Sequence, residues 1–169
     1  PTPKIIMLNF KTWIDADSCP SQLREFLVSE AEKSGFVAML VANRKILGES
    51  SNVRMIVCEQ KKDEADNIIL EQSEKNDIVV TRDLLFAKRL VEKGVTVFND
   101  RGTKFTKDNI DDRIMERNLS MNLSAIGLGG NKKNQYGQKE LKKFITEFKP
   151  ELQKHIVAEI YSKNAGNPM

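Results

Sequence analysis

Histidine and cysteine are nearly absent from this chain, which has one histidine and two cysteines in 169 residues. The spacing of Cys19 and Cys58 matches neither a metal-ligand motif nor a disulfide framework. Cys19 precedes Pro20 at a predicted helix start, where a thiolate is stabilised. A nucleophile also needs a base, and His155 lies far along the chain. We therefore expect Cys19 to be a packing residue and His155 to lie on the surface of a late, charged helix.

Long hydrophobic runs are also missing. No apolar stretch approaches the ~20 residues that a membrane helix needs, and the apolar residues 5–8 are followed at once by Asn9 and Lys11. The first residues lack the pattern of a signal peptide, so we expect a protein of the reducing cytoplasm with no membrane attachment. A formal net charge of +3 permits a nucleic-acid partner without arguing for one.

The sequence does contain short apolar runs that alternate with amphipathic segments. The runs are residues 12–14, 37–41, 53–58, 78–80 and 95–98. Their continuous hydrophobicity predicts strands covered on both faces, as in a parallel sheet. The segments between them have apolar residues at helical spacing, with proline or glycine at several of their boundaries. This alternation predicts an α/β fold with a parallel, doubly wound sheet of four to five strands flanked by helices.

The pattern becomes purely helical after about residue 106. One helix is predicted to open near Thr106, and a polar, glycine-containing loop separates it from a charged helix that begins at Gln138. Pro150 is expected to interrupt this second helix, and residues 163–169 are expected to form a frayed tail. Because the length fits one domain, we predict a single α/β domain over residues 1–162 with a helical C-terminal extension.

Five aspartates fall where the predicted strands end, which is where open α/β sheets bind ligands. Asp15 and Asp17 follow the first strand, and Asp83 comes shortly after the fourth. Asp63 and Asp66 share a face of the first turn of the helix after the third strand. Carboxylates that crowd together repel one another unless a cation intervenes, and carboxylate oxygens suit Mg²⁺ or Mn²⁺. The sequence therefore predicts a divalent-metal site at this edge.

Each of these acids also has a purely structural interpretation. Asp63 and Asp83 stand at predicted helix starts, where either fits an N-cap or a partner of the helix dipole. Asp66 also fits an ordinary acid of a first helical turn. Asp15 and Asp17 fit such a role less well, because a carboxylate pair that ends an apolar strand costs free energy without a partner.

Other polar residues near this edge are candidates for supporting roles. The Thr81 hydroxyl could fix an aspartate or a metal-bound water, although a β-branched residue is also ordinary in a strand. Asn43 and Asn67 are candidates for polar contacts behind the ligands, and each also fits a turn or a helix surface. Cations in the predicted loops could hold substrate phosphates, or could simply be solvated. These phosphate-binding candidates are Arg82, Arg101 and Lys62.

Several motifs together resemble the YaiI/YqxD family of bacterial proteins, a branch with a PIN-like fold. The resemblance begins with the stretch from Ile14 to Pro20, IDADSCP, and runs from about Lys11 to Phe148. The further matching stretches are LVAN at residues 40–43, DEADN at 63–67, DIVVTRD at 77–83, residues 84–94, NDRG at 99–102 and FT at 105–106. The motifs occur in the order and spacing of the family.

This resemblance implies a function as well as a fold. PIN domains are metal-dependent nucleases, mostly acting on RNA, with acids clustered at the carboxyl end of a parallel sheet. The resemblance implies that a metal-activated water attacks single-stranded RNA or another phosphodiester. The implied metal ligands are Asp15, Asp17, Asp66 and Asp83, with Asp63 as a further candidate. Asp100 and Asn131 depart from the family pattern, which has proline at both positions, and this affects loop shape more than metal chemistry.

Two other functions remain open on the sequence. An apolar strand followed by Asp-x-Asp also opens haloacid-dehalogenase-type phosphatases, in which Asp15 would become phosphorylated. Those enzymes need a later lysine and an acid pair after another strand, whereas Asp111 and Asp112 fall inside a predicted helix. The third possibility is a PIN-like binding or scaffold protein whose acids only cap helices.

Overall fold

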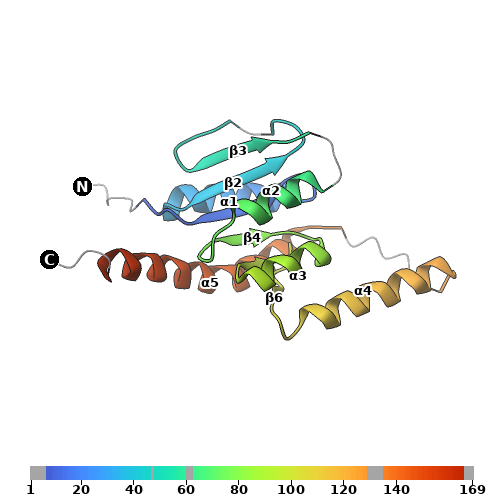
Figure 1. The fold of residues 1–169 in the computed structure, drawn as a ribbon. Coiled ribbons are helices and arrows are strands. Elements are labelled where there is room, and N and C mark those ends of the chain that lie inside the picture. The colour runs from blue at the N-terminus through green and yellow to red at the C-terminus, as the bar shows by residue number, and fades with distance from the viewer. Residues whose placement is uncertain (1–6, 47, 60–62, 129–134, 166–169) are drawn as a thin grey trace.

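Six strands form one sheet in the order β3-β2-β1-β4-β5-β6 (Figure 1). The computed structural model describes residues 7–46, 48–59, 63–128 and 135–165. The strands are β1 Lys11–Asp15, β2 Val37–Ala42, β3 Val53–Val57, β4 Ile78–Val80, β5 Thr96–Phe98 and β6 Lys104–Phe105. Strands β1 to β5 are parallel, and β6 is antiparallel to β5. The predicted parallel α/β sheet is confirmed, with one short strand that the apolar pattern did not reveal.

The strand order reverses beside β1. The chain builds β1, β2 and β3 outward in one direction, and then returns to place β4 on the other side of β1. Connections that leave neighbouring strands toward opposite faces open a crevice at the carboxyl edge between them. In this chain that crevice lies beyond Asp15 of β1 and Val80 of β4.

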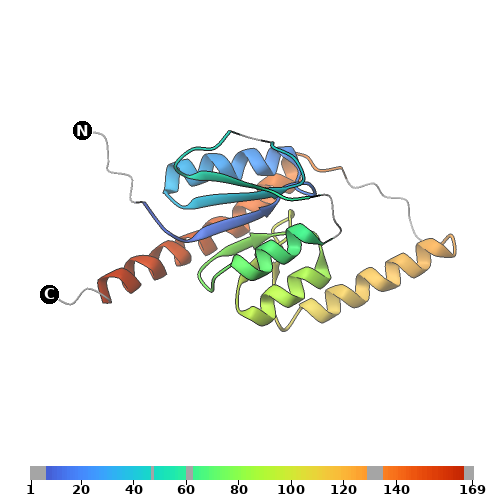
Figure 2. The same ribbon diagram turned by 45° about the horizontal axis from the view of Figure 1, so that its top comes forward.

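Helices cover both faces of the sheet. They are α1 Ser21–Ser34, α2 Glu64–Gln72, α3 Leu84–Lys93, α4 Ile110–Ala125 and α5 Gln138–Ala165. Side chains of α1 and α5 pack on one face, and those of α2, α3 and the start of α4 pack on the other. Only the first turns of α4 contact this core, and the rest of the helix projects beyond the sheet (Figures 1 and 2).

Burial on both faces explains the continuous apolar runs in the sequence. All six residues of β2 are buried, because α1 covers one side of the strand and α2 the other. Trp13 and Phe36 are also buried. On the α1–α5 face, Phe98 of β5 meets Phe144 and Phe148 of α5 edge to face, at centroid distances of 6.1 and 6.0 Å. Aromatic pairs of this kind add to the free energy of burial.

Pro150 does not interrupt α5, contrary to the expectation from sequence, and the helix extends through Ala165. A proline removes one helical hydrogen bond and crowds the carbonyl of the residue four positions earlier. Pro150 is exposed, so water can reach that carbonyl, while Phe148 and Leu152 on either side of it are buried against the sheet. Packing therefore maintains the helix across the proline. Of the expected tail, residues 166–169 lie outside the described part of the chain.

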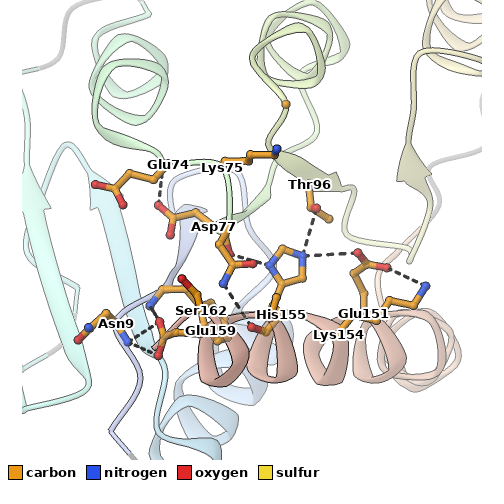
Figure 3. Close-up of a pocket in the computed structure, with 14 residues that line it drawn as sticks. Asn9, Glu74, Lys75, Asp77, Thr96, Glu151, Lys154, His155, Glu159 and Ser162 are labelled. Carbon is orange, nitrogen blue, oxygen red and sulfur yellow. Dashed lines mark hydrogen bonds and ion pairs between the residues drawn. The ribbon is translucent and has the colours of Figure 1, made fainter. Parts of the chain in front are cut away.

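His155 is buried rather than on the surface, contrary to the expectation from sequence. Its Nδ1 lies 2.6 Å from the Asn76 carbonyl oxygen, and its Nε2 lies 3.2 Å from the Thr96 hydroxyl and 3.5 Å from a Glu151 carboxylate oxygen (Figure 3). These contacts join α5 to the amino ends of β4 and β5. A charged helix still has one side that faces the protein, and His155 lies on that side.

Two carboxylates, the buried Asp77 and the partly buried Glu159, hold the amino edge of the sheet through hydrogen bonds. Asp77 accepts hydrogen bonds from the backbone N–H groups of Lys11 and Glu74, both at 2.9 Å, and from the Trp13 indole N–H at 3.0 Å. Glu159 of α5 accepts bonds from the first residues of the chain before β1, as Figure 3 shows for Asn9. Each of these carboxylates is satisfied by N–H donors, so this edge differs from the carboxyl edge. No helix within the described residues is both long enough and apolar enough to cross a membrane.

Candidate functional site

A cavity of about 650 Å³ opens at the carboxyl edge of the sheet, beside the crevice between β1 and β4. Asp15 reaches it from the end of β1, Asp63 and Asp66 from the start of α2, and Asp83 from the start of α3. We call it the acidic cavity. The structure thus brings together four of the five predicted aspartates, although up to 68 residues separate them in sequence.

Asp15 ends β1 in a half-buried position. The chain turns just after it, and the Ser18 hydroxyl donates a hydrogen bond of 3.1 Å to its carboxylate. Burial raises the pKa of Asp15 above its ordinary value, the Ser18 hydrogen bond opposes this, and the charges of Asp17 and Asp83 add to the rise. The ionised form of a carboxyl group with a raised pKa is stabilised when a cation approaches.

Asp83 caps α3, which confirms the structural interpretation for this residue. Its Oδ1 accepts hydrogen bonds from the N–H groups of Leu85 and Phe86, at 3.0 and 3.1 Å. The buried Thr81 hydroxyl accepts a bond from the Asp83 N–H at 3.1 Å, so Thr81 fixes the backbone of the aspartate, as the sequence suggested. No helix cap in the described residues involves Oδ2 of Asp83, and the capping role therefore does not occupy the whole carboxylate.

Asp66 is the most strongly perturbed acid of the cavity. Burial is the largest cause, followed by the negative charges of Asp15, Asp83 and Asp63 and by a hydrogen bond with Asp83, and together they raise the pKa of Asp66 to about 7. A pKa near 7 means that Asp66 keeps its proton in a large share of the molecules at neutral pH. Protonation of a crowded carboxyl group is the expected result when no cation offsets the negative charge around it.

Asp63 has an unusual backbone conformation. Its φ of 67° is left-handed, and it is the one non-glycine residue with positive φ among the described residues. Asparagine and aspartate tolerate this region better than most residues do, at some cost in free energy. Although Asp63 occupies the N-cap position of α2, its side chain makes no capping hydrogen bond. Asp63 thus stands at the predicted cap position without the capping bond, and its exposed carboxylate lines the acidic cavity.

Asp17 is not brought into the lining of the acidic cavity. It is exposed, and its Oδ2 accepts a hydrogen bond of 2.9 Å from the Asn43 backbone N–H, which ties the turn after β1 to the end of β2. Asn43 thus takes part in this network through its backbone N–H, which donates to Asp17. Asn67 lies on the exposed side of α2 and does not line the cavity.

Three arginines line the acidic cavity together with the aspartates. Arg82 comes from the loop after β4, Arg89 from α3 and Arg117 from α4. Arg82 also forms an ion pair with Asp100, a buried residue of the loop after β5. Arg101 lies outside the acidic cavity and pairs with Glu140 at 3.8 Å. Lys62 lies outside the described residues, as does Asn131.

The four aspartates suit a hard divalent ion, because carboxylate oxygens are the ligands that such an ion prefers, and these acids outnumber the three arginines of the same lining. Within the described residues, no three His, Cys, Asp or Glu side chains already stand close enough together to hold a metal ion. The four acids thus line a common cavity without forming a ready-made set of metal ligands. The chemistry of the donors and the raised pKa of Asp66 agree with a site for Mg²⁺ or Mn²⁺.

Comparison with known proteins places the chain in a family. The model of a family described as uncharacterized BCR, YaiI/YqxD family, matches residues 13–154. The chain belongs to the YaiI/YqxD family. A UPF0178 protein of Treponema denticola is 42% identical over 134 residues, which cover 79% of this chain and 86% of that protein. A UPF0178 protein of Yersinia enterocolitica is 34% identical over 149 residues, or 88% and 98% of the two chains. No solved structure matches the chain.

Three further polar residues of this YaiI/YqxD protein belong to the lining of the acidic cavity and were not predicted there. They are Ser18, Arg89 and Arg117. Ser18 could have been found from its place three residues after Asp15 in a tight turn. No local sequence pattern marks Arg117 as a residue of the cavity, because its place there depends on the direction of α4, which only the folded chain reveals.

Asp66→Asn should stabilise the metal-free protein increasingly as the pH rises. Between its ordinary pKa of 3.8 and about 7, the folded state holds a proton on Asp66 that the unfolded state has lost, so the stability of the parent falls as the pH rises through this interval. Asparagine mimics the neutral form and avoids this loss. In EDTA we expect the melting temperature of the variant to exceed that of the parent by a few °C at pH 8 (roughly 3 °C), with a smaller gain at pH 5. A gain that is equal at both pH values would contradict the assignment.

Proposed function

We propose that this protein is a divalent-metal-dependent phosphodiesterase that cleaves single-stranded RNA. One observation carries the proposal. Four carboxylates from three separate elements, Asp15, Asp63, Asp66 and Asp83, line one cavity at the carboxyl edge where the strand order reverses. Burial, followed by the negative charges of Asp15, Asp83 and Asp63, raises the pKa of Asp66 to about 7. Crowding of carboxylates is costly unless a ligand of positive charge relieves it. The resemblance of the sequence to PIN-type nucleases points to the same chemistry.

Each residue of the acidic cavity has a role in this proposal. Asp15, Asp66 and Asp83 would hold the ion, with Asp63 at the rim as a further oxygen donor and Asp17 fixing the turn that carries Asp15. When bound, Mg²⁺ or Mn²⁺ supplies a nucleophilic water and stabilises charge on the phosphodiester. Ser18 orients the Asp15 carboxylate, and Thr81 orients Asp83. Arg82, Arg89 and Arg117 line the same cavity and can neutralise the negative charge of the phosphate.

The phosphatase alternative finds less support in the arrangement. That chemistry needs a lysine and an acid pair near Asp15, and no lysine is among the described residues that line the acidic cavity. Asp111 and Asp112 lie in the first turn of α4, where Asp111 pairs with Lys88 at 2.8 Å. Asp111 therefore serves the contact between α3 and α4, and neither residue lines the cavity.

The direct test combines metal binding with RNA cleavage. We expect Mn²⁺ to raise the melting temperature of the protein by more at pH 8 than at pH 6, because the ion must displace the proton on Asp66. End-labelled single-stranded RNA should be cleaved when Mn²⁺ or Mg²⁺ is present and left intact in EDTA. If calorimetry detects no heat of Mn²⁺ binding and the RNA stays intact, the protein is a binding or scaffold protein instead. A phosphoaspartate trapped on Asp15 would point to the phosphatase.

A further inference from the structure

A second cavity adjoins the acidic one, and four of its nine lining residues are arginines. It has a volume of about 460 Å³. We call it the arginine pocket, and its charged lining consists of Arg82, Arg101, Arg113, Arg117, Asp100 and Glu116. Arg82, Leu84 and Arg117 line both cavities. The two cavities therefore meet across these three side chains.

The arginine pocket has an excess of positive charge, since four arginines face two acids. The buried Asp100 pairs with Arg82, while Glu116 lies 3.9 Å from Arg113 on the exposed surface of α4. An exposed pair at such a distance contributes little. None of the ion pairs in the described part of the chain involves Arg117. Arg113 and Arg117 are thus available for an anionic ligand.

Three parts of the fold bring the arginines together. Arg113 and Arg117 are four residues apart on α4 and so lie on the same side of that helix. The buried Ile110 anchors the start of α4 to the core beside α3, and this is the end of the helix that stays with the body of the domain (Figure 2). Arg82 follows β4, and Arg101 follows β5. The pocket is therefore built on the carboxyl edge of two adjacent strands.

We propose that the arginine pocket binds a second phosphate of the substrate, next to the phosphodiester held in the acidic cavity. The inference rests on the proposed function and names its substrate class: a strand that carries at least two phosphates. A guanidinium group can donate two parallel hydrogen bonds to the oxygens of one phosphate, and it keeps its charge at all physiological pH values. In the acidic cavity four aspartates oppose three arginines, whereas in the arginine pocket four arginines oppose two acids, so the arginine pocket attracts a phosphate more strongly when no cation is bound. The second phosphate is either the neighbouring internucleotide linkage or a terminal monophosphate.

Binding measurements on Arg113 variants test the arginine pocket itself. Arg113 lines only this pocket. In EDTA, fluorescence anisotropy with a labelled single-stranded oligoribonucleotide should give a Kd about tenfold higher for Arg113→Gln than for the parent, and about a hundredfold higher for Arg113→Gln with Arg117→Gln. The slope of log Kd against log salt should fall by about 0.7 for each lost contact. Lys149→Gln, an equal loss of charge at an exposed site of α5, should bind as the parent does.

A comparison of substrates identifies which phosphate is bound. It also separates the test of this inference from the test of the proposed function. If a terminal phosphate is bound, 5′-phosphorylated oligonucleotides should bind more tightly than 5′-hydroxyl ones; equal binding assigns the pocket to an internal linkage. In the cleavage assay with Mn²⁺, Arg113→Gln should lose at least about tenfold more activity on the oligonucleotide than on bis(p-nitrophenyl) phosphate, which has one phosphate. Equal losses, or unchanged Kd values, would overturn the inference. Loss of affinity in Arg113→Gln without cleavage by the parent would overturn only the proposed function.

Discussion

Asp15→Asn should reduce metal-dependent RNA cleavage by roughly 10³-fold while the fold remains intact. Asp15 is the acid that β1 delivers directly to the acidic cavity, and its carboxylate is oriented by Ser18. Asparagine keeps the shape and one oxygen that can accept the Ser18 hydrogen bond, but it removes the charge that attracts a divalent ion. The rate of cleavage with Mn²⁺ and the Mn²⁺-induced rise in melting temperature should therefore disappear together.

The metal-free form of this variant provides an internal control. Since Asp15→Asn removes repulsion with Asp17 and Asp83, its melting temperature in EDTA should equal or exceed that of the parent. Asp112→Asn makes the same chemical change at an exposed site of α4 that does not line the cavity, and it should retain full cleavage. If Asp15→Asn cleaves RNA as fast as Asp112→Asn does, the acidic cavity is not the site of the reaction.

Asp77→Ala should be the most destabilising single substitution at the amino edge of the sheet. The Asp77 carboxylate is buried and accepts three N–H groups, from the backbone of Lys11 and Glu74 and from the Trp13 indole. Alanine leaves these donors without their acceptor, at a cost of about 3–5 kcal/mol. The melting temperature should fall by about 10 °C, and the urea midpoint should fall with an unchanged slope.

The single tryptophan makes this prediction easy to follow. Trp13 is the only tryptophan of the chain, and its indole N–H donates to Asp77, so its fluorescence reports on the region that changes. Asp77→Asn, which keeps one acceptor oxygen, should lose less stability than Asp77→Ala. An exposed site, Asp108→Ala, should stay close to the parent. A urea midpoint of Asp77→Ala that matches the Asp108→Ala value would contradict the structural role.

The sequence predicted most of the fold because burial leaves a direct trace in residue type. β2 is covered on both faces and consists of six consecutive buried apolar residues, so its pattern is continuous and unmistakable. Gly35 and Gly94 end α1 and α3 with φ angles of 88° and 93°, which glycine adopts without strain. β6 escaped prediction, because a two-residue strand is defined by its hydrogen bonds to β5 rather than by any periodicity.

The candidate site was predicted in part. Asp15, Asp63, Asp66 and Asp83 could be placed at one edge because each follows a parallel strand or opens the next helix. The orientation of Asp17 could not, since its partner is a backbone N–H of Asn43, 26 residues away. Pro150 and His155 show the same limit. Their environments depend on which side of α5 packs against the sheet.

By itself, the sequence determined the α/β class, the parallel strands and the strand ends at which carboxylates appear, because these follow from local hydrophobicity and from the short range of turn and cap preferences. Only the tertiary structure decided that α4 starts beside the acidic cavity, and thereby that Arg113 and Arg117 join Arg82 and Arg101 in one pocket. The reason is physical. The position of α4 is set by the burial of Ile110 against a core that includes residues as distant in sequence as Trp13 and Val41, and no local pattern encodes those contacts.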